Sequence, residues 1–156
     1  MPRHLITRLS IVLFSLTLGA CARFSEHSTG LSNGSLIDCP AWPRCVSSLA
    51  ADANKLVQPL FLNAPLERSW DNLIAVVGQT ARTRLVRRSD HYLHAEVISP
   101  WGWYTDDLEL LLDPQSGRVD VRSSGRIGYY DFDVNLDRVE ALRTALQKQG
   151  LLKSTF

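Results

Sequence analysis

The stretch TRLVRRSDHYLHAEVISPWGWYTDDLELLLDPQSGRVDV (residues 83–121) decides the fold, because apolar and polar residues alternate in it between three turn sequences. The turns fall at residues 89–91, 100–103 and 113–117, where Ser, Asp, Pro and Gly gather. Short turns join neighbouring antiparallel strands. The stretch therefore predicts a four-stranded antiparallel meander.

An apolar stripe at helical spacing precedes the meander and runs from Leu66 to Val77. We expect Asn63 to cap this helix, Pro65 to begin it and Gly78 to end it. The stripe gives the helix one face that must be buried.

A second amphipathic segment follows the meander. We expect Asp133 or Asn135 to open this helix and Gly150 to supply a left-handed cap at its end. The predicted fold class is α+β: a single two-layer domain, with a four-stranded antiparallel meander and an N-terminal and a C-terminal helix on one face.

The sheet face away from the helices carries charged residues. The strand register predicts Arg84 opposite Glu96 and Glu109 opposite Arg122. We interpret these as solvated ion pairs, each contributing some tenths of a kcal/mol. Asp106 points to the other side of its strand, and if buried it needs backbone or arginine hydrogen bonds to stay ionised.

Few side chains suit acid–base or metal chemistry. His91 and His94 are three residues apart on a strand, so their side chains leave on opposite faces and cannot form a joint site. The sequence has no nucleophile elbow, phosphate-binding glycine loop, helical zinc pair or dinucleotide motif. We therefore predict no catalytic residue, no cofactor and no metal site, and we favour a noncatalytic protein over an enzyme.

The densest polar stretch joins the fourth strand to the last helix, and it holds our candidate binding site. Its arginines, hydroxyls and helix N-terminus suit a small anionic ligand. We favour a closed network of ion pairs and caps, because carboxylates already lie at the start of the helix. The candidate residues are Arg122, Ser123, Arg126, Asp131, Asn135 and Arg138. An enzyme, the alternative, would centre on Arg122, Arg126, Asp131 and Asn135.

An aromatic cluster lies in the second turn of the meander, at Trp101, Trp103 and Tyr104. We expect these rings to pack against the helix layer, which is the usual fate of aromatic side chains. A place at a membrane interface and a contact with a ligand are the alternatives.

The N-terminus has the pattern of a bacterial lipoprotein signal peptide over residues 1–20. Basic residues precede a ten-residue apolar run, and Leu18-Gly19-Ala20-Cys21 forms a lipobox. The run is about half the length of a membrane span. We expect Cys21 to be lipidated and the protein to be anchored on the periplasmic side of the cell envelope. Since Ala22 stands where an inner-membrane retention signal has aspartate, we expect the outer membrane.

Residues 21–36 are rich in Ser, Gly and Asn, so we expect a lipidated flexible tether there. Residues 37–156 then form one α+β domain, since about 120 residues suffice for a single core. The formal net charge is +1 with interspersed signs, which argues against nucleic acid as a partner.

Two cysteines remain once Cys21 is lipidated. An oxidising compartment favours a disulfide between Cys39 and Cys45 over free thiols, and their spacing makes a metal site a poor alternative.

Several motifs, in order along the chain, resemble the domain-of-unknown-function family numbered 1499. They are CP at 39–40, PRCVSS at 43–48, ARTR at 81–84, TDDLE at 105–109, VRS at 121–123 continuing through Arg126, Gly128, Asp131 and Asn135, and RVE at 138–140. The resemblance implies an envelope or membrane-associated domain, often found in bacterial lipoproteins, without an assigned activity. The chain departs from the family pattern with Arg44 for asparagine, Lys55 for histidine, Ala81 for proline and Asp133 for glycine. The change at Lys55 removes a candidate ligand or base.

The sequence thus predicts a lipid-anchored envelope protein that binds a ligand or maintains the envelope without catalysis. Its expected partners are the membrane, through the lipid anchor, and either a small anionic ligand or another envelope protein.

Overall fold

A computed structural model describes residues 28–153 of the chain, and an antiparallel meander forms the centre of the sheet. Its strands are β5 (Thr83–Arg88), β6 (Tyr92–Ile98), β7 (Thr105–Leu112) and β8 (Arg118–Gly125), each hydrogen-bonded to the next. The predicted meander is confirmed, because alternation and turn chemistry agree along this stretch.

The sheet has six strands, so the prediction of a four-stranded sheet is wrong. Both β3 (Cys45–Ser47) and β4 (Leu60–Phe61) pair antiparallel with β8 and extend the meander beyond it. A short 3₁₀ helix, η2 (Ala53–Lys55), lies between them. Strands of two or three residues are too short to show alternation, and their partner lies far along the chain.

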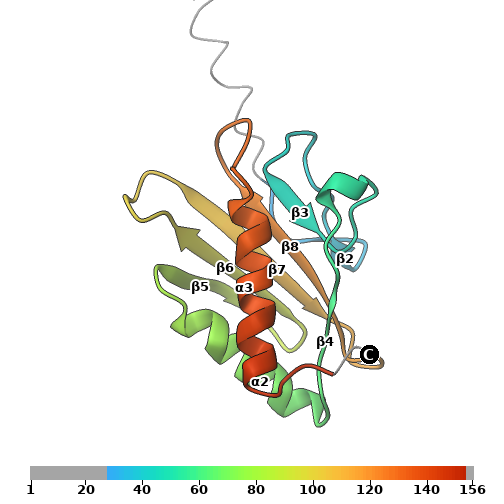
Figure 1. Ribbon diagram of the computed structural model, residues 1–156. Helices are drawn as coiled ribbons and strands as arrows, with labels where there is room; N and C mark the ends of the chain where they lie inside the picture. The colour runs from blue at the N-terminus through green and yellow to red at the C-terminus, as the bar shows by residue number, and fades with distance from the viewer. Residues whose placement is uncertain (1–27, 154–156) are drawn as a thin grey trace, which may run out of the picture.

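Both helices contribute to one core with the same sheet face, as predicted. In Figure 1, α3 (Val134–Lys148) crosses this face and α2 (Leu66–Gln79) lies toward the β5 side. Buried side chains from both helices and from the meander form one cluster. It includes Trp70, Leu73, Val77, Leu93, Leu110, Val121, Val139 and Leu146. The two-layer α+β class is therefore correct.

The N-terminus of α2 differs from the prediction. Pro65 occupies the capping position without a side-chain hydrogen bond, and the helix begins at Leu66. The Asn63 amide instead donates to the carbonyls of Gly150 and Leu152, at 2.8 and 2.9 Å. Asn63 therefore ties the start of one helix to the end of the other. Gly150 has φ +66°, which confirms the predicted left-handed cap.

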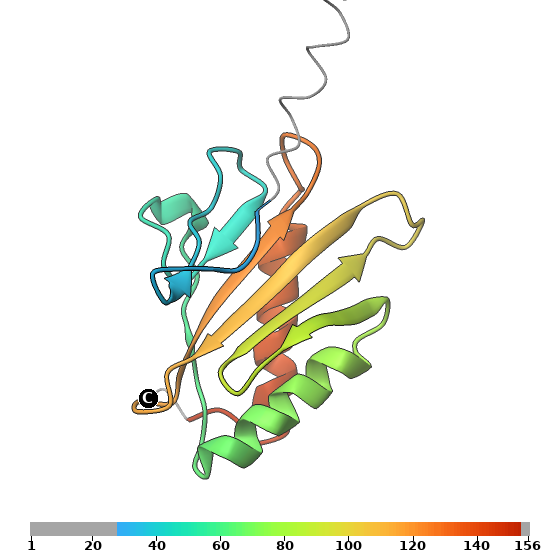
Figure 2. The same cartoon turned by 180° about the vertical axis from the view of Figure 1, so that it is seen from behind.

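A small hairpin lies on the sheet face opposite the helices (Figure 2). It consists of β1 (Leu31–Ser32) and β2 (Ser35–Leu36), and the Leu36 side chain is buried. The sequence predicts a flexible tether over residues 21–36. Within the described chain that boundary is wrong, because the hairpin is packed and the domain begins before residue 37.

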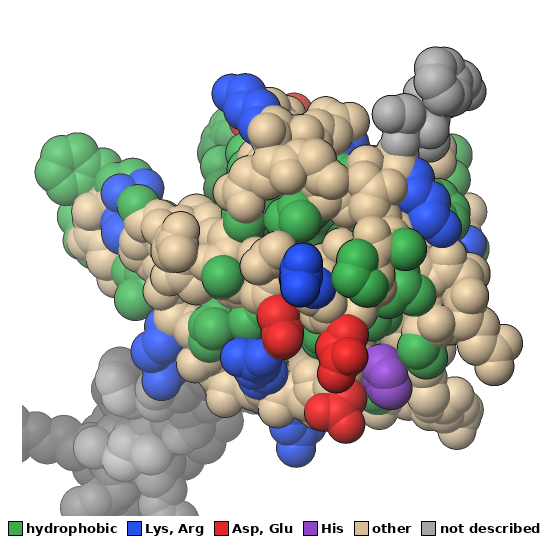
Figure 3. All heavy atoms as spheres, turned by 90° about the horizontal axis from the view of Figure 1, so that it is seen from below, with side chains coloured by type: hydrophobic (Ala, Val, Ile, Leu, Met, Phe, Trp, Pro, Cys, Tyr) green, Lys and Arg blue, Asp and Glu red, His purple; other side chains and the backbone are tan. Residues whose placement is uncertain are grey.

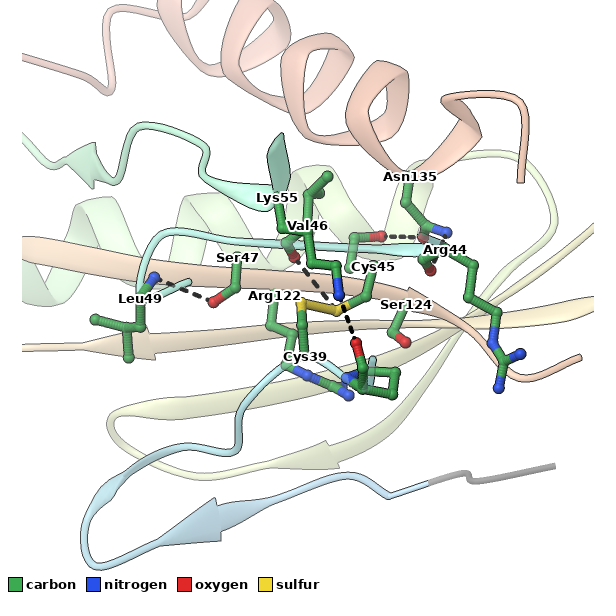
Figure 4. Close-up of a disulfide and its surroundings, with 12 residues drawn as sticks. Cys39, Arg44, Cys45, Val46, Ser47, Leu49, Lys55, Arg122, Ser124 and Asn135 are labelled. Atoms are coloured by element: carbon green, nitrogen blue, oxygen red, sulfur yellow. Dashed lines mark hydrogen bonds between the residues drawn. A yellow bond between two sulfur atoms is a disulfide. The ribbon is translucent and has the colours of Figure 1, made fainter. Parts of the chain in front are cut away.

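Cys39 and Cys45 form the predicted disulfide, shown in Figure 4. The Lys55 ammonium donates to the carbonyls of Pro40 and Ala41 inside this loop, at 2.7 and 2.9 Å. Lys55 thus holds the disulfide loop.

We predict that replacing both Cys39 and Cys45 with serine lowers the free energy of unfolding by about 2 kcal/mol, because the unfolded chain gains the entropy of an open loop. Denaturant unfolding with and without reductant measures this change. Reductant should destabilise the wild type and leave the double variant unaffected. Equal stability of the two oxidised proteins would contradict the prediction.

Candidate functional site

The charged sheet face forms two linked groups, of which the first centres on Asp107. Arg126 donates to Asp107 through Nε at 2.9 Å and through Nη2 at 2.7 Å. Arg126 Nη2 also lies 2.6 Å from Glu96, which pairs with Arg84. His94 Nε2 lies 2.6 Å from the Asp107 carboxylate, and both residues are buried. The cross-strand pairing of Arg84 with Glu96 is as predicted.

Glu109 is the centre of the second group and has no solvent-exposed surface. Its carboxylate accepts hydrogen bonds from Arg122 Nη1, the Tyr92 hydroxyl and the Gly30 backbone N–H, each at 2.6 Å. The predicted pairing of Glu109 with Arg122 is confirmed, but their predicted exposure to solvent is wrong. The residues around Gly30 cover this face, and the register alone could not reveal that cover.

These contacts shift several pKa values. A hydrogen bond from Arg126, aided by Arg84, lowers the pKa of Glu96. Hydrogen bonds to Asp107 and Glu96 raise the pKa of Arg126. Burial, followed by the hydrogen bond to Glu109, raises the pKa of Tyr92. These shifts favour a charged Glu96, a charged Arg126 and a neutral Tyr92.

We expect Tyr92 to be the last tyrosine to ionise in an alkaline titration. Its pKa is raised above the ordinary value of 10.0, so the neutral phenol contributes stability fully below pH 10. That contribution is lost as the pH rises through the folded pKa. Phenolate absorbance should show a late step that Tyr92→Phe removes and the exposed-site control Tyr104→Phe retains. A late step that persists in Tyr92→Phe would refute the assignment.

A separate polar network lies on the helix side and centres on Asn135, which is fully buried. Its side-chain oxygen accepts from Ser123 Oγ at 2.6 Å and from Arg138. Its amide nitrogen donates to the Arg44 carbonyl at 3.1 Å and to Asp131 at 2.7 Å. One side chain thus joins α3 to β8 and to the segment preceding β3.

Arg138 completes this network by binding Asp106 through Nη2 at 2.6 Å and Ser123 Oγ through Nη1 at 2.8 Å. Burial raises the pKa of Asp106, while the charge and hydrogen bond of Arg138 oppose the shift. Asp106 therefore has the arginine partner that its position required.

Asp133 occupies the N-cap position of α3, as predicted, but its side chain makes no capping hydrogen bond, and Asp131 supplies that bond instead. The Asp131 carboxylate accepts from the backbone N–H groups of Asp133 and Asn135, at 3.2 and 3.1 Å. Asp133 and the preceding Phe132 both have left-handed backbone, with φ +63° and +56°. Glycine adopts such angles without strain, whereas Phe132 and Asp133 adopt them with a side chain.

The six candidate residues therefore do not form one cluster. Arg122 and Arg126 lie on the charged face, whereas Ser123, Asn135 and Arg138 lie on the helix side. Figure 4 shows Arg122 and Asn135 on opposite sides of the sheet. Side chains of a strand alternate between faces, so a continuous polar sequence was split in two.

A hollow of about 290 Å³ opens beside the helix-side network, between the β6–β7 and β8–α3 loops. Two carboxylates, Asp106 and Asp131, border it. Most of the other side chains around it are apolar or aromatic: Tyr104, Ile127, Tyr130, Phe132 and Val134. Sequence reasoning missed this site, although its signal was available in two aromatic clusters on turns of the same sheet end.

The predicted packing of the second-turn aromatics is wrong. Trp101, Trp103 and Tyr104 are all exposed, because the β6–β7 loop extends past the end of the helix layer (Figures 1 and 2). Their rings are therefore available to a ligand or to another surface.

The disulfide loop supports the far side of the hollow. Arg44 is fully buried and donates to the carbonyls of Gly125 and Gly128 at the end of β8. Trp42 packs edge-on against Tyr129, with ring centroids 5.4 Å apart. The disulfide loop thus holds the β8–α3 loop, which carries Tyr130 and Phe132 at the hollow.

A larger hollow, of about 800 Å³, lies at the opposite end of the sheet. It is bordered by Glu67, Asp71, Arg88, Asp90 and His91, and Arg88 pairs with Asp71 at 2.6 Å. None of the candidate binding residues lines it. No group of three or more His, Cys, Asp or Glu side chains within residues 28–153 could hold a metal ion.

None of the helices in the described part of the chain is long and apolar enough to cross a membrane. Cys21 and the predicted signal peptide lie outside the described residues.

The fold and site define a small two-layer α+β domain with paired charges on one sheet face and an aromatic hollow at one end. The chain belongs to the family described as protein of unknown function (DUF1499), which it matches over residues 35–146. Comparisons with curated proteins and with solved structures gave no match.

Proposed function

We propose that this chain is a lipid-anchored protein of the cell envelope that acts by binding an apolar ligand, without catalysis, in the hollow between the β6–β7 and β8–α3 loops. The observation that carries the proposal is the contrast between the two parts of the site. The arginines among the candidate residues are paired with carboxylates on both faces of the sheet, whereas the aromatic and aliphatic side chains around the hollow are exposed. Binding pockets commonly combine apolar walls with a few polar groups.

The paired charges favour an apolar ligand over the small anion considered from the sequence. Arg122, Arg126 and Arg138 each lie within 2.7 Å of a carboxylate oxygen. An incoming anion would have to displace that carboxylate. The enzyme alternative also loses support, because Arg122 and Arg126 lie across the sheet from Asn135.

Lipid anchoring is the second part of the proposal, and the lipobox at residues 18–21 supports it. We expect the mature protein to begin at an acylated Cys21, and Cys21→Ser to accumulate as a larger, uncleaved precursor. Mass spectrometry of the N-terminal peptide measures both. A mature peptide that begins elsewhere, without an acyl chain, would exclude the anchor.

A photoreactive amino acid placed in the full-length chain tests the binding site. Tyr130 lines the hollow and is 46% exposed, and Val86 on β5, 44% exposed, is a control with matched exposure. Irradiation of intact cells should add an apolar small molecule to the probe at position 130 and none at position 86. The added mass identifies the ligand class. Equal labelling at both positions, or none at either, would oppose the proposal.

A further inference from the structure

Exposed aromatic side chains gather at one end of the molecule. In the described chain the exposed aromatic residues are Trp101, Trp103, Tyr104, Tyr129, Tyr130 and Phe132. All six belong to the β6–β7 and β8–α3 loops, which follow strands running in the same direction and therefore lie at the same end of the sheet. Three of them are exposed to a degree unusual for large rings: Trp101 by 81%, Trp103 by 77% and Phe132 by 82%.

The opposite end has a different surface. Figure 3, seen from below, shows acidic and basic side chains mixed with scattered hydrophobic ones. The larger hollow there is bordered by charged residues and His91 as well as by Leu66, Trp70, Leu112 and Pro114, and none of its aromatic side chains belongs to the exposed group. The exposed aromatic side chains are therefore confined to one end of the domain. A partner that contacts that end, and not the other, would explain their position.

The described chain begins at the aromatic end. The Ile37 N–H donates to the Gly30 carbonyl at 3.3 Å, so residues before Gly30 run back alongside those after Ile37. That direction leads toward Cys39, whose disulfide partner Cys45 pairs with Ser124 near the end of β8. The first described residues therefore lie toward the end of the sheet that carries the two aromatic loops.

The segment between Cys21 and the first described residue is short. Seven residue steps separate Cys21 from Ser28, the first described residue, and a fully extended chain spans at most about 25 Å over seven residues. A lipid on Cys21 would therefore hold the aromatic end near the bilayer. Tryptophan and tyrosine favour the interface between lipid and water, because their rings are apolar and their N–H and O–H groups still need polar partners.

We propose that Trp101, Trp103, Tyr104, Tyr129, Tyr130 and Phe132 form a membrane-docking surface that enters the interfacial region of the bilayer. The loops orient the domain so that the hollow faces the membrane, and its apolar ligand is then a membrane lipid. This inference deepens the proposed function and rests on it for the anchor at Cys21.

Quenching of tryptophan fluorescence by brominated lipid tests the docking surface. The full-length mature protein is purified in detergent and reconstituted into vesicles of phosphatidylethanolamine and phosphatidylglycerol, with or without bromine on the acyl chains. Bromine quenches tryptophans that reach the lipid. We expect brominated vesicles to remove about half of the emission, because Trp101 and Trp103 are two of the four tryptophans.

Two variants assign the signal. Replacing both Trp101 and Trp103 with phenylalanine keeps an aromatic surface and should abolish most of the fractional quenching. Trp70→Phe removes a tryptophan that is buried in the core, and fractional quenching should then increase. Equal quenching of the wild type and the Trp101/Trp103 double variant would overturn the proposed surface.

Flotation of the vesicles and the N-terminal mass separate failure of the docking surface from failure of the anchor. Acylated protein that floats with the vesicles without quenching overturns the docking surface and leaves the anchored binding protein standing. If the protein is not acylated, the anchor fails and vesicles are added to the free protein. Quenching in that mixture supports the surface on its own, and no quenching overturns it.

Discussion

Glu109→Gln should lower the free energy of unfolding by about 3 to 5 kcal/mol, the largest effect that we expect from one polar substitution. The change keeps the shape of the side chain but removes the charge opposite Arg122, which is 1% exposed. A buried cation without its partner is strongly destabilising. Arg122 Nε already lacks a hydrogen-bond partner among the described residues, so loss of the Glu109 charge adds to a guanidinium that is incompletely paired. Denaturant unfolding measures the loss.

Arg84→Ala is the matched control, because it breaks an ion pair on the same sheet face. The Arg84 side chain is 68% exposed, so solvent screens its contact with Glu96. We expect that change to cost less than about 1 kcal/mol. If Glu109→Gln and Arg84→Ala have equal effects, then the charged face is solvated and the hairpin does not cover it.

Asn135→Ala should produce the second large effect, a loss of about 2 to 4 kcal/mol. The side chain bonds Ser123, Arg138, Asp131 and the Arg44 carbonyl, so its removal takes four hydrogen bonds from a largely buried network. Each lost hydrogen bond costs about 0.5 to 1.5 kcal/mol, with partial relief from rearrangement. Because Asn135 joins β8, α3 and the disulfide loop, the β8–α3 loop should also exchange its amide hydrogens faster.

Glu140→Ala, on the exposed side of the same helix, controls for helix stability. It should change the free energy of unfolding by about 0.5 kcal/mol or less. Hydrogen exchange by mass spectrometry compares the two variants over residues 126–133. An Asn135→Ala protein as stable as Glu140→Ala would exclude Asn135 as the link between these elements.

The strands and turns that are determined by neighbouring residues in the chain were predicted correctly from the sequence. Alternation between Tyr92 and Val97, and turn chemistry at residues 113–117, identified the meander, because side-chain period and turn residues depend on neighbours in the chain. The same register arithmetic paired Glu109 with Arg122. The number of cysteines and the expected compartment predicted the Cys39–Cys45 disulfide.

The candidate site was predicted only in part. The polar stretch from Arg122 to Asn135 was recognised as important, but its arginines pair with Glu109, Asp107 and Glu96 of neighbouring strands, and its Asp131 caps α3 instead of pairing with them. Its division between two faces was missed, because the strand continues through Gly125 and separates neighbours such as Arg122 and Ser123. The aromatic hollow was missed as well, since it depends on two loops about 25 residues apart.

The sequence alone determined the class of the domain, the order of its central strands and the charges that face one another, because each follows from periodicity and short-range register. Only the tertiary structure decided that a hairpin at residues 31–36 and the residue before it cover Glu109, that β3 and β4 extend the sheet, and that Trp101 and Trp103 remain exposed. These features depend on contacts between distant segments, and burial is set by whatever covers a residue in space.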